Sequence, residues 1–384
     1  MNPAGEIEVT IVGSGVIGLS CAWRLSRSGV RVEVLTASGR PPAAGASMGV
    51  LAYPSVLAQG AFVGLHRRSL DSFPSYIRTL EEETGEQSGY RRSEALELLT
   101  AEHQYIQAAN ELQRARARKW EVQGRPALEL LSTDEARRLE PLVEIGPYGA
   151  MLHRASARVD ARRFLVMLGA ACRRRGVRFR ASPVKAILAG NGKVQGVDIG
   201  ERTLPRRNVI VCAGAWSSQL HPDLEKHCPV YPVRGQTVLV QANRKICQRI
   251  VRRADLYIVP QSRRRYLLGA TTERHSGFDS QVTVEGLRRI LTEAEHAAPD
   301  LAKAAFVRAF AGLRPAGLLG RPWIGPIPEI DGLYVAAGHY KTGLALAPIT
   351  AEIIFECLQQ AAPAPEWAAV LPGRRKETED APNG

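Results

Sequence analysis

Three glycines near the N-terminus have the spacing that is found in phosphate-binding turns. They are Gly13, Gly15 and Gly18, in the pattern G-x-G-x-x-G. In such a turn the first glycine permits a tight bend, the second lets the backbone approach a pyrophosphate, and the third allows a helix to pack closely on a strand. This spacing therefore favours dinucleotide binding, and a purely structural glycine turn is the alternative.

The segments on either side of these glycines match what a dinucleotide site needs. Residues 9–12 form a β-branched run that predicts a buried parallel strand. Residues 19–28 show the apolar spacing of a helix, which Gly29 ends, and residues 30–35 predict a second strand. A strand, a glycine turn and a helix in this order place the phosphates at the positive end of the helix.

One part of the dinucleotide pattern is missing. An acidic residue usually closes the second strand and bonds the ribose hydroxyls. Thr36 stands at that place, and Glu33 lies earlier on the strand and is expected to point elsewhere. We expect Thr36 or Ser38 to bond a ribose hydroxyl more weakly, with the pyrophosphate site unaffected.

The composition limits the class of protein. At roughly 100–200 residues per domain, 384 residues suggest two domains. No apolar stretch is long enough for a membrane span and the N-terminus has no basic signal-peptide region, so a cytoplasmic protein is expected.

The six cysteines lack paired spacing and are expected to be reduced, buried thiols. The net charge of +13 is interpreted as an arginine-rich surface, because no nucleic-acid-binding module is present. The tail after Pro372 is expected to be loose.

Three further segments rich in small residues could approach a flat ring closely. They lie at 44–52, 208–216 and 332–343, and the third joins a strand, a glycine loop and the start of an apolar helix. With these segments the sequence resembles the D-amino-acid oxidase superfamily, and most closely the glycine oxidases of thiazole biosynthesis. The resemblance covers nearly the whole chain.

The motifs that carry the resemblance occur in one order along the chain. Besides the glycine turn they are Glu82-Glu83-Thr84-Gly85, Gly89-Tyr90-Arg91-Arg92, Arg158-Val159-Asp160-Ala161-Arg162, Ala213-Gly214-Ala215-Trp216-Ser217, Pro232-Val233-Arg234-Gly235-Gln236, Tyr257-Ile258-Val259-Pro260, Gly269-Ala270-Thr271, Gly312-Leu313-Arg314-Pro315 and Gly338-His339-Tyr340.

The resemblance implies a fold and a cofactor. The fold is α/β, with a Rossmann-like FAD-binding domain at 1–85, 150–222 and 308–384. A second, α+β substrate domain built on a mixed or antiparallel sheet takes 86–149 and 223–307. FAD is expected to be bound without a covalent link. Its implied contacts are Gly13, Gly15, Val16, Ile17, Gly18, Thr36, Ala46, Ser47, Gly49, Val50, Leu51, Val184, Ala213, Gly214, Trp216, Arg314, Gly338, His339, Tyr340, Lys341, Thr342 and Gly343.

The resemblance also implies a substrate site. Arg314 is the first candidate for binding a substrate carboxylate, because a guanidinium can form a bidentate pair with it. Tyr257 could bond the same carboxylate through its hydroxyl, or be a core aromatic of the sheet. Lys341 stands where glycine oxidases usually carry arginine, and is either a carboxylate ligand or a solvated loop residue. His339 is expected to pack beside the flavin rather than to transfer protons.

Two further departures weaken the case for glycine itself as substrate. Thr342 replaces an asparagine, and Thr272 replaces an apolar residue after the Gly-Ala-Thr motif. The substrate expected is therefore a small amino acid or amine: glycine, sarcosine, a D-amino acid or a cyclic amine.

The reaction expected is hydride transfer from the substrate to FAD, with oxygen as acceptor and hydrogen peroxide as product. The alternatives are a dehydrogenase that passes electrons to a quinone or protein partner, and a flavoprotein without catalysis. A homo-oligomer is expected. No metal-binding set of residues is present in the sequence.

Overall fold

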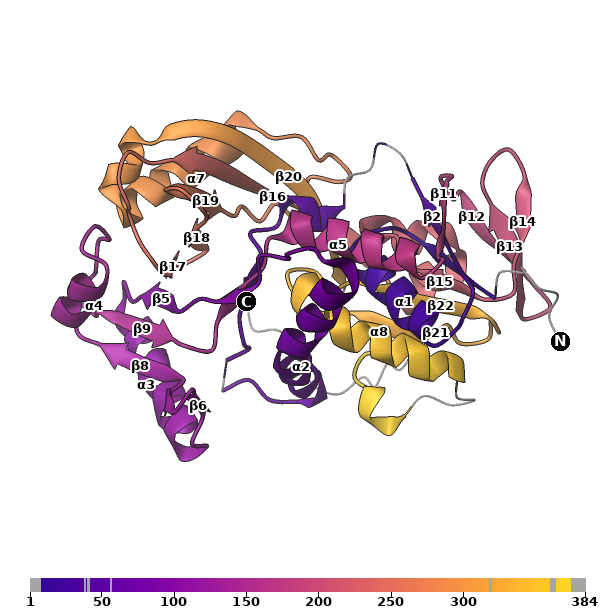
Figure 1. Ribbon diagram of the computed structural model, residues 1–384, viewed down its shortest axis with the longest axis horizontal. Helices are drawn as coiled ribbons and strands as arrows, with labels where there is room; N and C mark the ends of the chain where they lie inside the picture. Colours follow the sequence, from indigo (N-terminus) through magenta and orange to yellow (C-terminus); the bar gives the residue numbers. More distant parts are fainter. Residues whose placement is uncertain are drawn as a thin grey trace.

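The computed structural model of this chain describes residues 8–37, 39, 42–55, 57–317, 320–359 and 364–373. Ser38 and the tail beyond Gly373, for which expectations were stated above, lie outside these residues. The described part of the chain is built around two large sheets that lie side by side (Figure 1).

The first sheet has six strands and carries the N-terminal glycine turn. In order across the sheet they are β11 (Arg178–Ala181), β2 (Val32–Thr36), β1 (Val9–Val12), β15 (Val209–Val211), β22 (Leu333–Ala337) and β21 (Trp323–Pro326). All neighbours are parallel except β21 and β22. This arrangement confirms the Rossmann-like unit.

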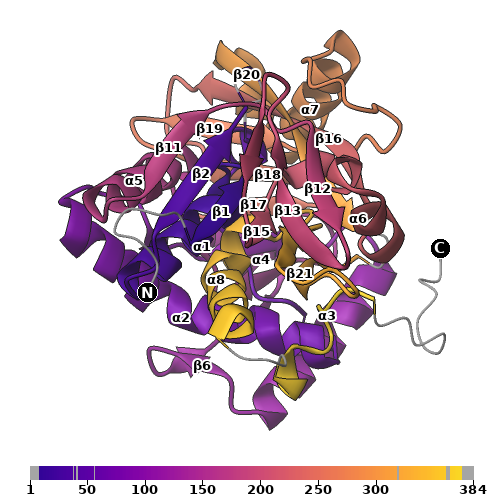
Figure 2. The same ribbon diagram turned by 90° about the vertical axis from the view of Figure 1, so that its right-hand side faces the viewer.

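Helices cover one face of the six-stranded sheet and a small sheet covers the other. The helices are α1 (Val16–Arg27), α2 (Ala61–Thr84), α5 (Ala161–Arg174) and α8 (Gly343–Gln359), which share one hydrophobic core. The small antiparallel sheet consists of β12 (Ala186–Gly190), β13 (Lys193–Asp198) and β14 (Thr203–Pro205), and its strands β12 and β13 lie towards the viewer in Figure 2. Alternation along a strand explains the two layers, since Ile11 packs in the helical core and Val12 in the core beneath the small sheet.

The second sheet has eight strands. Their order is β20 (Ala305–Gly317), β16 (Val230–Gln241), β19 (Arg265–Gly269), β18 (Leu256–Pro260), β17 (Ile250–Arg253), β5 (Ala95–Leu98), β9 (Ala150–His153) and β8 (Leu128–Leu131). Every pair is antiparallel except β17 with β5. Helix α7 (Val284–Ala297) packs on this sheet, with α3 (Glu102–Ala117) and α4 (Thr133–Leu139) at its far end. The expected mixed sheet is confirmed.

Several shorter elements complete the described fold. They are β3 (Val50–Leu51), β4 (Arg91–Arg92), β10 (Ala157–Arg158), β6 (Glu121–Val122), β7 (Arg125–Pro126), α6 (Pro222–His227) and the 3₁₀ turns η1 (Ala43–Ala46), η2 (Gly214–Leu220), η3 (Pro299–Lys303) and η4 (Pro365–Trp367).

The sheets divide the chain differently from the expected domain boundaries. The boundary at 150 falls at the start of β9, which pairs with β5 and β8 of the eight-stranded sheet. The boundary at 308 falls inside β20, which continues to Gly317 in that same sheet. The strand pairing therefore assigns β9 and the whole of β20 to the eight-stranded sheet.

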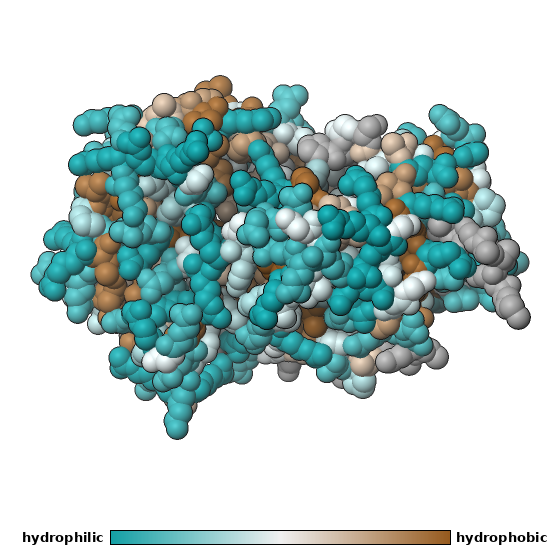
Figure 3. Space-filling model, in the orientation of Figure 1, coloured by the Kyte–Doolittle hydropathy of each residue, from teal (hydrophilic) through white to brown (hydrophobic). Residues whose placement is uncertain are grey.

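Other expectations about local features are met. All six cysteines are free and buried. Arg263 and Arg264 lie in the hairpin turn between β18 and β19, and both have positive φ. The face of the molecule in Figure 3 is mostly hydrophilic, with scattered apolar patches. Among the described residues, no helix is both long and apolar enough to cross a membrane.

Ion pairs of Glu33 stabilise the edge of the six-stranded sheet. Its carboxylate is buried in β2 and is paired with Arg180 at 3.1 Å and Arg206 at 2.6 Å. Burial alone would raise the pKa of Glu33, but hydrogen bonds and charge from the two arginines lower it. Glu33 thus joins β2 to β11 and to the segment after β14, and it does not reach the end of the strand, as expected.

Replacing Glu33 should destabilise the fold. In Glu33→Gln both arginines lose a buried charge partner, so we expect the free energy of unfolding to fall by about 1–3 kcal/mol. The loss should shrink as the pH falls through the folded-state pKa of Glu33, because the lowered pKa gives stability only above that range. Denaturant unfolding at neutral and acid pH measures both effects.

The matched control is Asp331→Asn. The Asp331 carboxylate pairs with Lys193 at 3.8 Å, and both side chains are largely exposed, so little stability should be lost. An equal loss in both variants would contradict the structural role of Glu33.

Candidate functional site

The glycine turn leads from β1 to the N-terminus of α1. Gly13 has a φ of +116°, and a Cβ there would collide with the carbonyl of Cys212. A Cβ on Gly18 would collide with the carbonyl oxygen of Gly13. These two glycines therefore let the helix lie directly against the strands, as the spacing predicts.

Gly15 has a different reason to be glycine. A Cβ there would meet no atom within 4 Å, because the residue faces an open cavity. Gly15 is also the N-cap of α1, with no side-chain cap and no acidic residue in the first helical turn. The free N–H groups of that turn are therefore available to an anion. This arrangement fits the pyrophosphate of a dinucleotide.

The glycine turn and the first turn of α1 together form a cradle for the pyrophosphate. Two side-chain hydroxyls lie at the end of this cradle where a ribose is expected. The Oγ of Ser14 and the Oγ1 of Thr36 lie 2.7 Å apart, and both residues line the cavity. With Glu33 committed to its two arginines, no described carboxylate lines this end of the cavity. A hydroxyl pair would be a neutral ligand for a ribose. This agrees with the presence of Thr36 at the place where the dinucleotide pattern usually has an acidic residue.

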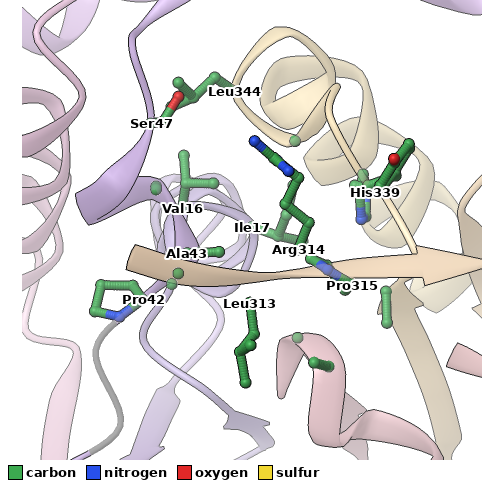
Figure 4. A pocket seen from close by; sticks show the side chains of 18 of the residues that line it. Val16, Ile17, Pro42, Ala43, Ser47, Leu313, Arg314, Pro315, His339 and Leu344 are labelled. Carbon is green, nitrogen blue, oxygen red and sulfur yellow. The ribbon is translucent and has the colours of Figure 1, made fainter. Parts of the chain in front are cut away.

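One cavity of about 450 Å³ extends from this cradle to the eight-stranded sheet (Figure 4). The expected site residues that line it are Gly13, Gly15, Val16, Ile17, Thr36, Ala46, Ser47, Val50, Val184, Ala213, Gly214, Trp216, Tyr257, Arg314, His339, Tyr340, Lys341, Thr342 and Gly343. Segments that are separated by hundreds of residues in the sequence thus line the same cavity.

Four expected cofactor contacts do not line the cavity. Gly18 packs against Gly13, as described above. Gly49 has a φ of +73° and abuts the carbonyl of Val159, so it serves close backbone packing. The side chain of Leu51 is buried in the helical core, and Gly338 lies in the turn after β22. Their place is behind the cavity wall.

The structure also adds lining residues that the sequence pattern missed. Ser14 and Cys212 lie beside predicted positions, while His66 comes from α2 and Asp255 from the turn between β17 and β18. Asp255 stands two residues before Tyr257, and strand alternation could have placed it on the same side. His66 has no signal in the sequence, because only the packing of α2 brings it to the wall.

Arg314 lies on β20 and extends into the cavity towards α8 (Figure 4). Its Nη1 donates to the carbonyl of Thr271 at 2.9 Å. The guanidinium lies flat against Gly235, where any Cβ would collide with it. Burial lowers the pKa of Arg314, and no described acidic side chain forms an ion pair with it. An unpaired cation in a partly closed cavity favours an anionic ligand.

Tyr257 and Lys341 also line the cavity. Tyr257 is on β18, and burial raises the pKa of its hydroxyl. Lys341 follows β22 and is exposed, with its Nζ 5.4 Å from the centre of the Tyr340 ring. Partial burial and the charge of Arg314 lower the pKa of Lys341. The cavity lining therefore offers a phenol and a second cation besides Arg314.

His339 is a neutral wall residue. It is almost fully buried, and its Nε2 lies 3.0 Å from the hydroxyl of Thr350 in α8. Burial lowers the pKa of His339 to about 3. The ring is therefore uncharged at neutral pH, which agrees with a packing role beside the cofactor.

Comparisons with known proteins agree with this geometry. Residues 8–357 match the family DAO, described as FAD dependent oxidoreductase. The chain is 30% identical over 359 residues to glycine oxidase of Geobacillus kaustophilus, covering 92% of this chain and 93% of that protein. A crystal structure of glycine oxidase from Geobacillus kaustophilus superposes with a TM-score of 0.86, at 29% identity, covering 96% and 98% of the two chains.

A second solved structure has a different substrate in its description. It is iminodiacetate oxidase from Chelativorans sp. BNC1, which superposes with a TM-score of 0.85 at 26% identity, covering 95% of this chain and 99% of that one.

Filling the cradle should weaken FAD binding without harming the fold. In Gly15→Ala the new methyl group would occupy the space in front of α1, and φ is −72°, so no backbone strain is added. We expect the dissociation constant of FAD to rise roughly tenfold or more, a loss of about 1.4 kcal/mol. Titration of the apoprotein with FAD, followed by flavin fluorescence, measures it.

The control is Gly64→Ala. Gly64 lies in α2, and a Cβ there also meets open space, so FAD should bind as in the wild type. Unchanged FAD affinity in Gly15→Ala would refute the cradle.

Proposed function

Because the chain belongs to the DAO family of FAD-dependent oxidoreductases, we propose that it oxidises a small primary or secondary amino acid to the imine, with oxygen accepting the electrons. The chain is an FAD-dependent amino acid oxidoreductase, and FAD is its cofactor. The choice of substrate and of acceptor is what we propose. The observation that carries the proposal is the unpaired guanidinium of Arg314 in the same cavity as the dinucleotide cradle.

The residues of the cavity suit an amino acid whose carboxylate enters first. Arg314 would bind the carboxylate as a bidentate partner, because its own N–H groups are committed only to the Thr271 carbonyl. The hydroxyl of Tyr257 would donate a further hydrogen bond. Lys341, which lines the same cavity, adds attraction for the negative charge. Three groups thus fix one end of the substrate, which leaves the carbon next to nitrogen in a defined place.

The same cations favour the reactive form of the substrate. A positive charge near an ammonium group lowers its pKa, since two like charges repel. Arg314 and Lys341 therefore help to hold the substrate amine neutral, with its electron pair available. Bound FAD supplies the acceptor for the hydride that leaves the neighbouring carbon. The imine that results hydrolyses in water without a catalytic group from the protein.

The wall around the flavin position adds no acid or base. His339 is neutral, and the lining segments at 43–47 and 213–215 present small apolar and hydroxyl residues. The N-terminus of α8, at Gly343, also lines the cavity and provides a positive dipole end. This dipole would stabilise negative charge on the reduced cofactor. The chain therefore contributes positioning and electrostatics.

Removing the guanidinium should weaken substrate binding. In Arg314→Ala we expect the substrate dissociation constant to rise by about 10- to 150-fold, which corresponds to about 1.5–3 kcal/mol for a charged hydrogen bond. Arg314→Lys should recover part of the affinity, because the charge stays but the fork is lost. Anaerobic bleaching of the bound flavin by glycine, sarcosine, D-amino acids and proline measures it.

The matched control is Arg308→Ala. Arg308 lies on the same strand, is exposed and does not line the cavity, so its loss should leave substrate binding unchanged. Normal saturation of Arg314→Ala would show that its assigned role is wrong.

The proposed acceptor has its own test. With a substrate that bleaches the flavin, turnover in air should release one hydrogen peroxide for each substrate oxidised. Peroxide and an artificial dye acceptor are measured side by side with the same substrate. Dye reduction without peroxide in air would replace oxygen by a quinone or protein acceptor, and bleaching by no amine at all would favour a non-catalytic flavoprotein.

A further inference from the structure

Asp255 is the one carboxylate among the described residues that line the cavity. It stands in the turn that joins β17 to β18 and is exposed to solvent. Tyr257 follows it by two residues and lines the same cavity. Asp255 is therefore placed at the substrate end, far along the cavity wall from the glycine turn.

The lining side chains near Asp255 have a simple charge balance. Arg314 and Lys341 are positive, and Asp255 is negative. Of the lining histidines, burial lowers the pKa of His66 to about 4 and that of His339 to about 3, so both are neutral at pH 7. The described wall thus has a net charge of +1.

Charged residues just outside the lining change this net charge little. Glu273 acts on Arg314, but its Oε2 lies 2.7 Å from the Nε of Arg234, so its charge is compensated. Arg252 influences Lys341, but its Nη1 lies 3.3 Å from the Oε1 of Glu97, so its charge is compensated as well. Arg274 also influences Lys341 and is exposed, where water and salt screen it. Asp255 itself acts on Arg314, Lys341 and Tyr257, which shows that it is within electrostatic reach of all three.

A substrate with one carboxylate and a neutral amine has a charge of −1 and would neutralise the wall. A second carboxylate would add an uncompensated negative charge in a space where Asp255 already stands. Lys341 alone would attract such a group, but Asp255 opposes that attraction. Lys341 and Asp255 together therefore favour a substrate with a charge of −1, a preference that Arg314 alone would not give.

We propose that Asp255 is a specificity-determining residue, which makes the cavity favour substrates with a single carboxylate and disfavour dicarboxylates. This inference rests on the proposed function, because it assumes that the substrate carboxylate binds to Arg314. It adds the substrate class: amino acids whose remaining part is neutral or positively charged.

The experiment compares Asp255→Asn with the wild type as FAD-loaded enzymes. Acetate and malonate, which have no amine, are titrated against the flavin absorbance spectrum to give binding constants without turnover. Alanine, aspartate and iminodiacetate are then compared by anaerobic bleaching. In Asp255→Asn the dicarboxylates should bind about fivefold more tightly, the size of one close interaction between unit charges in water. The monocarboxylates should change by much less.

Two further variants separate this effect from others. Glu201→Gln removes one negative charge from an exposed turn between β13 and β14, so it controls for the net charge of the protein and should not change the preference. Asp255→Glu keeps the charge and should keep the wild-type preference.

The outcomes distinguish the proposed role of Asp255 from the proposed function on which it rests. An unchanged ratio of malonate to acetate affinity in Asp255→Asn, or an equal change in Glu201→Gln, overturns the role of Asp255. If no amine bleaches the wild-type flavin, the proposed function fails, while the charge preference is still decided by the acetate and malonate titrations.

Discussion

The long antiparallel pair of β16 and β20 connects the cofactor half of the cavity to the substrate half. The pair runs from Val230–Gly317 at one end to Gln241–Ala305 at the other. Near its middle, Gly312 lies against Ala46, and the hydroxyl of Thr237 donates to the carbonyl of Ala46 at 3.3 Å. Arg314 follows on the same strand. Because strand register fixes these positions together, the end of the cavity at Arg314 cannot move independently of the end at Ala46.

The C-terminal loop is attached to the same strand. The N–H of Tyr340 donates to the carbonyl of Pro315 at 2.7 Å, and His339 pairs with Ala316 as a β-bridge. This brings Lys341 and the start of α8 next to Arg314. Two cations and a helix N-terminus consequently surround one end of the cavity, which is the field that a carboxylate substrate and a reduced flavin both require.

The parts predicted well from the sequence are those whose geometry is local. The roles of Gly13, Gly15 and Gly18 follow from a six-residue turn, and the prediction that Glu33 points away from the ribose place follows from its distance from the end of β2. Gly49 and Leu51 show the limit of this reasoning. They belong to the expected small-residue loop, yet one packs on Val159 and the other in the core, because neighbours more than 100 residues away decide which side chains face the cavity.

The sequence by itself determined the dinucleotide turn with the two strands and the helix around it, and the flavoprotein resemblance, since these depend on residue type and short spacing. Only the tertiary structure decided that β9 joins the eight-stranded sheet, that Arg314 has no described acidic partner and that Asp255 stands in the same cavity. The physical reason is that charge balance and burial depend on which distant segments meet, and the chain order does not contain that information directly.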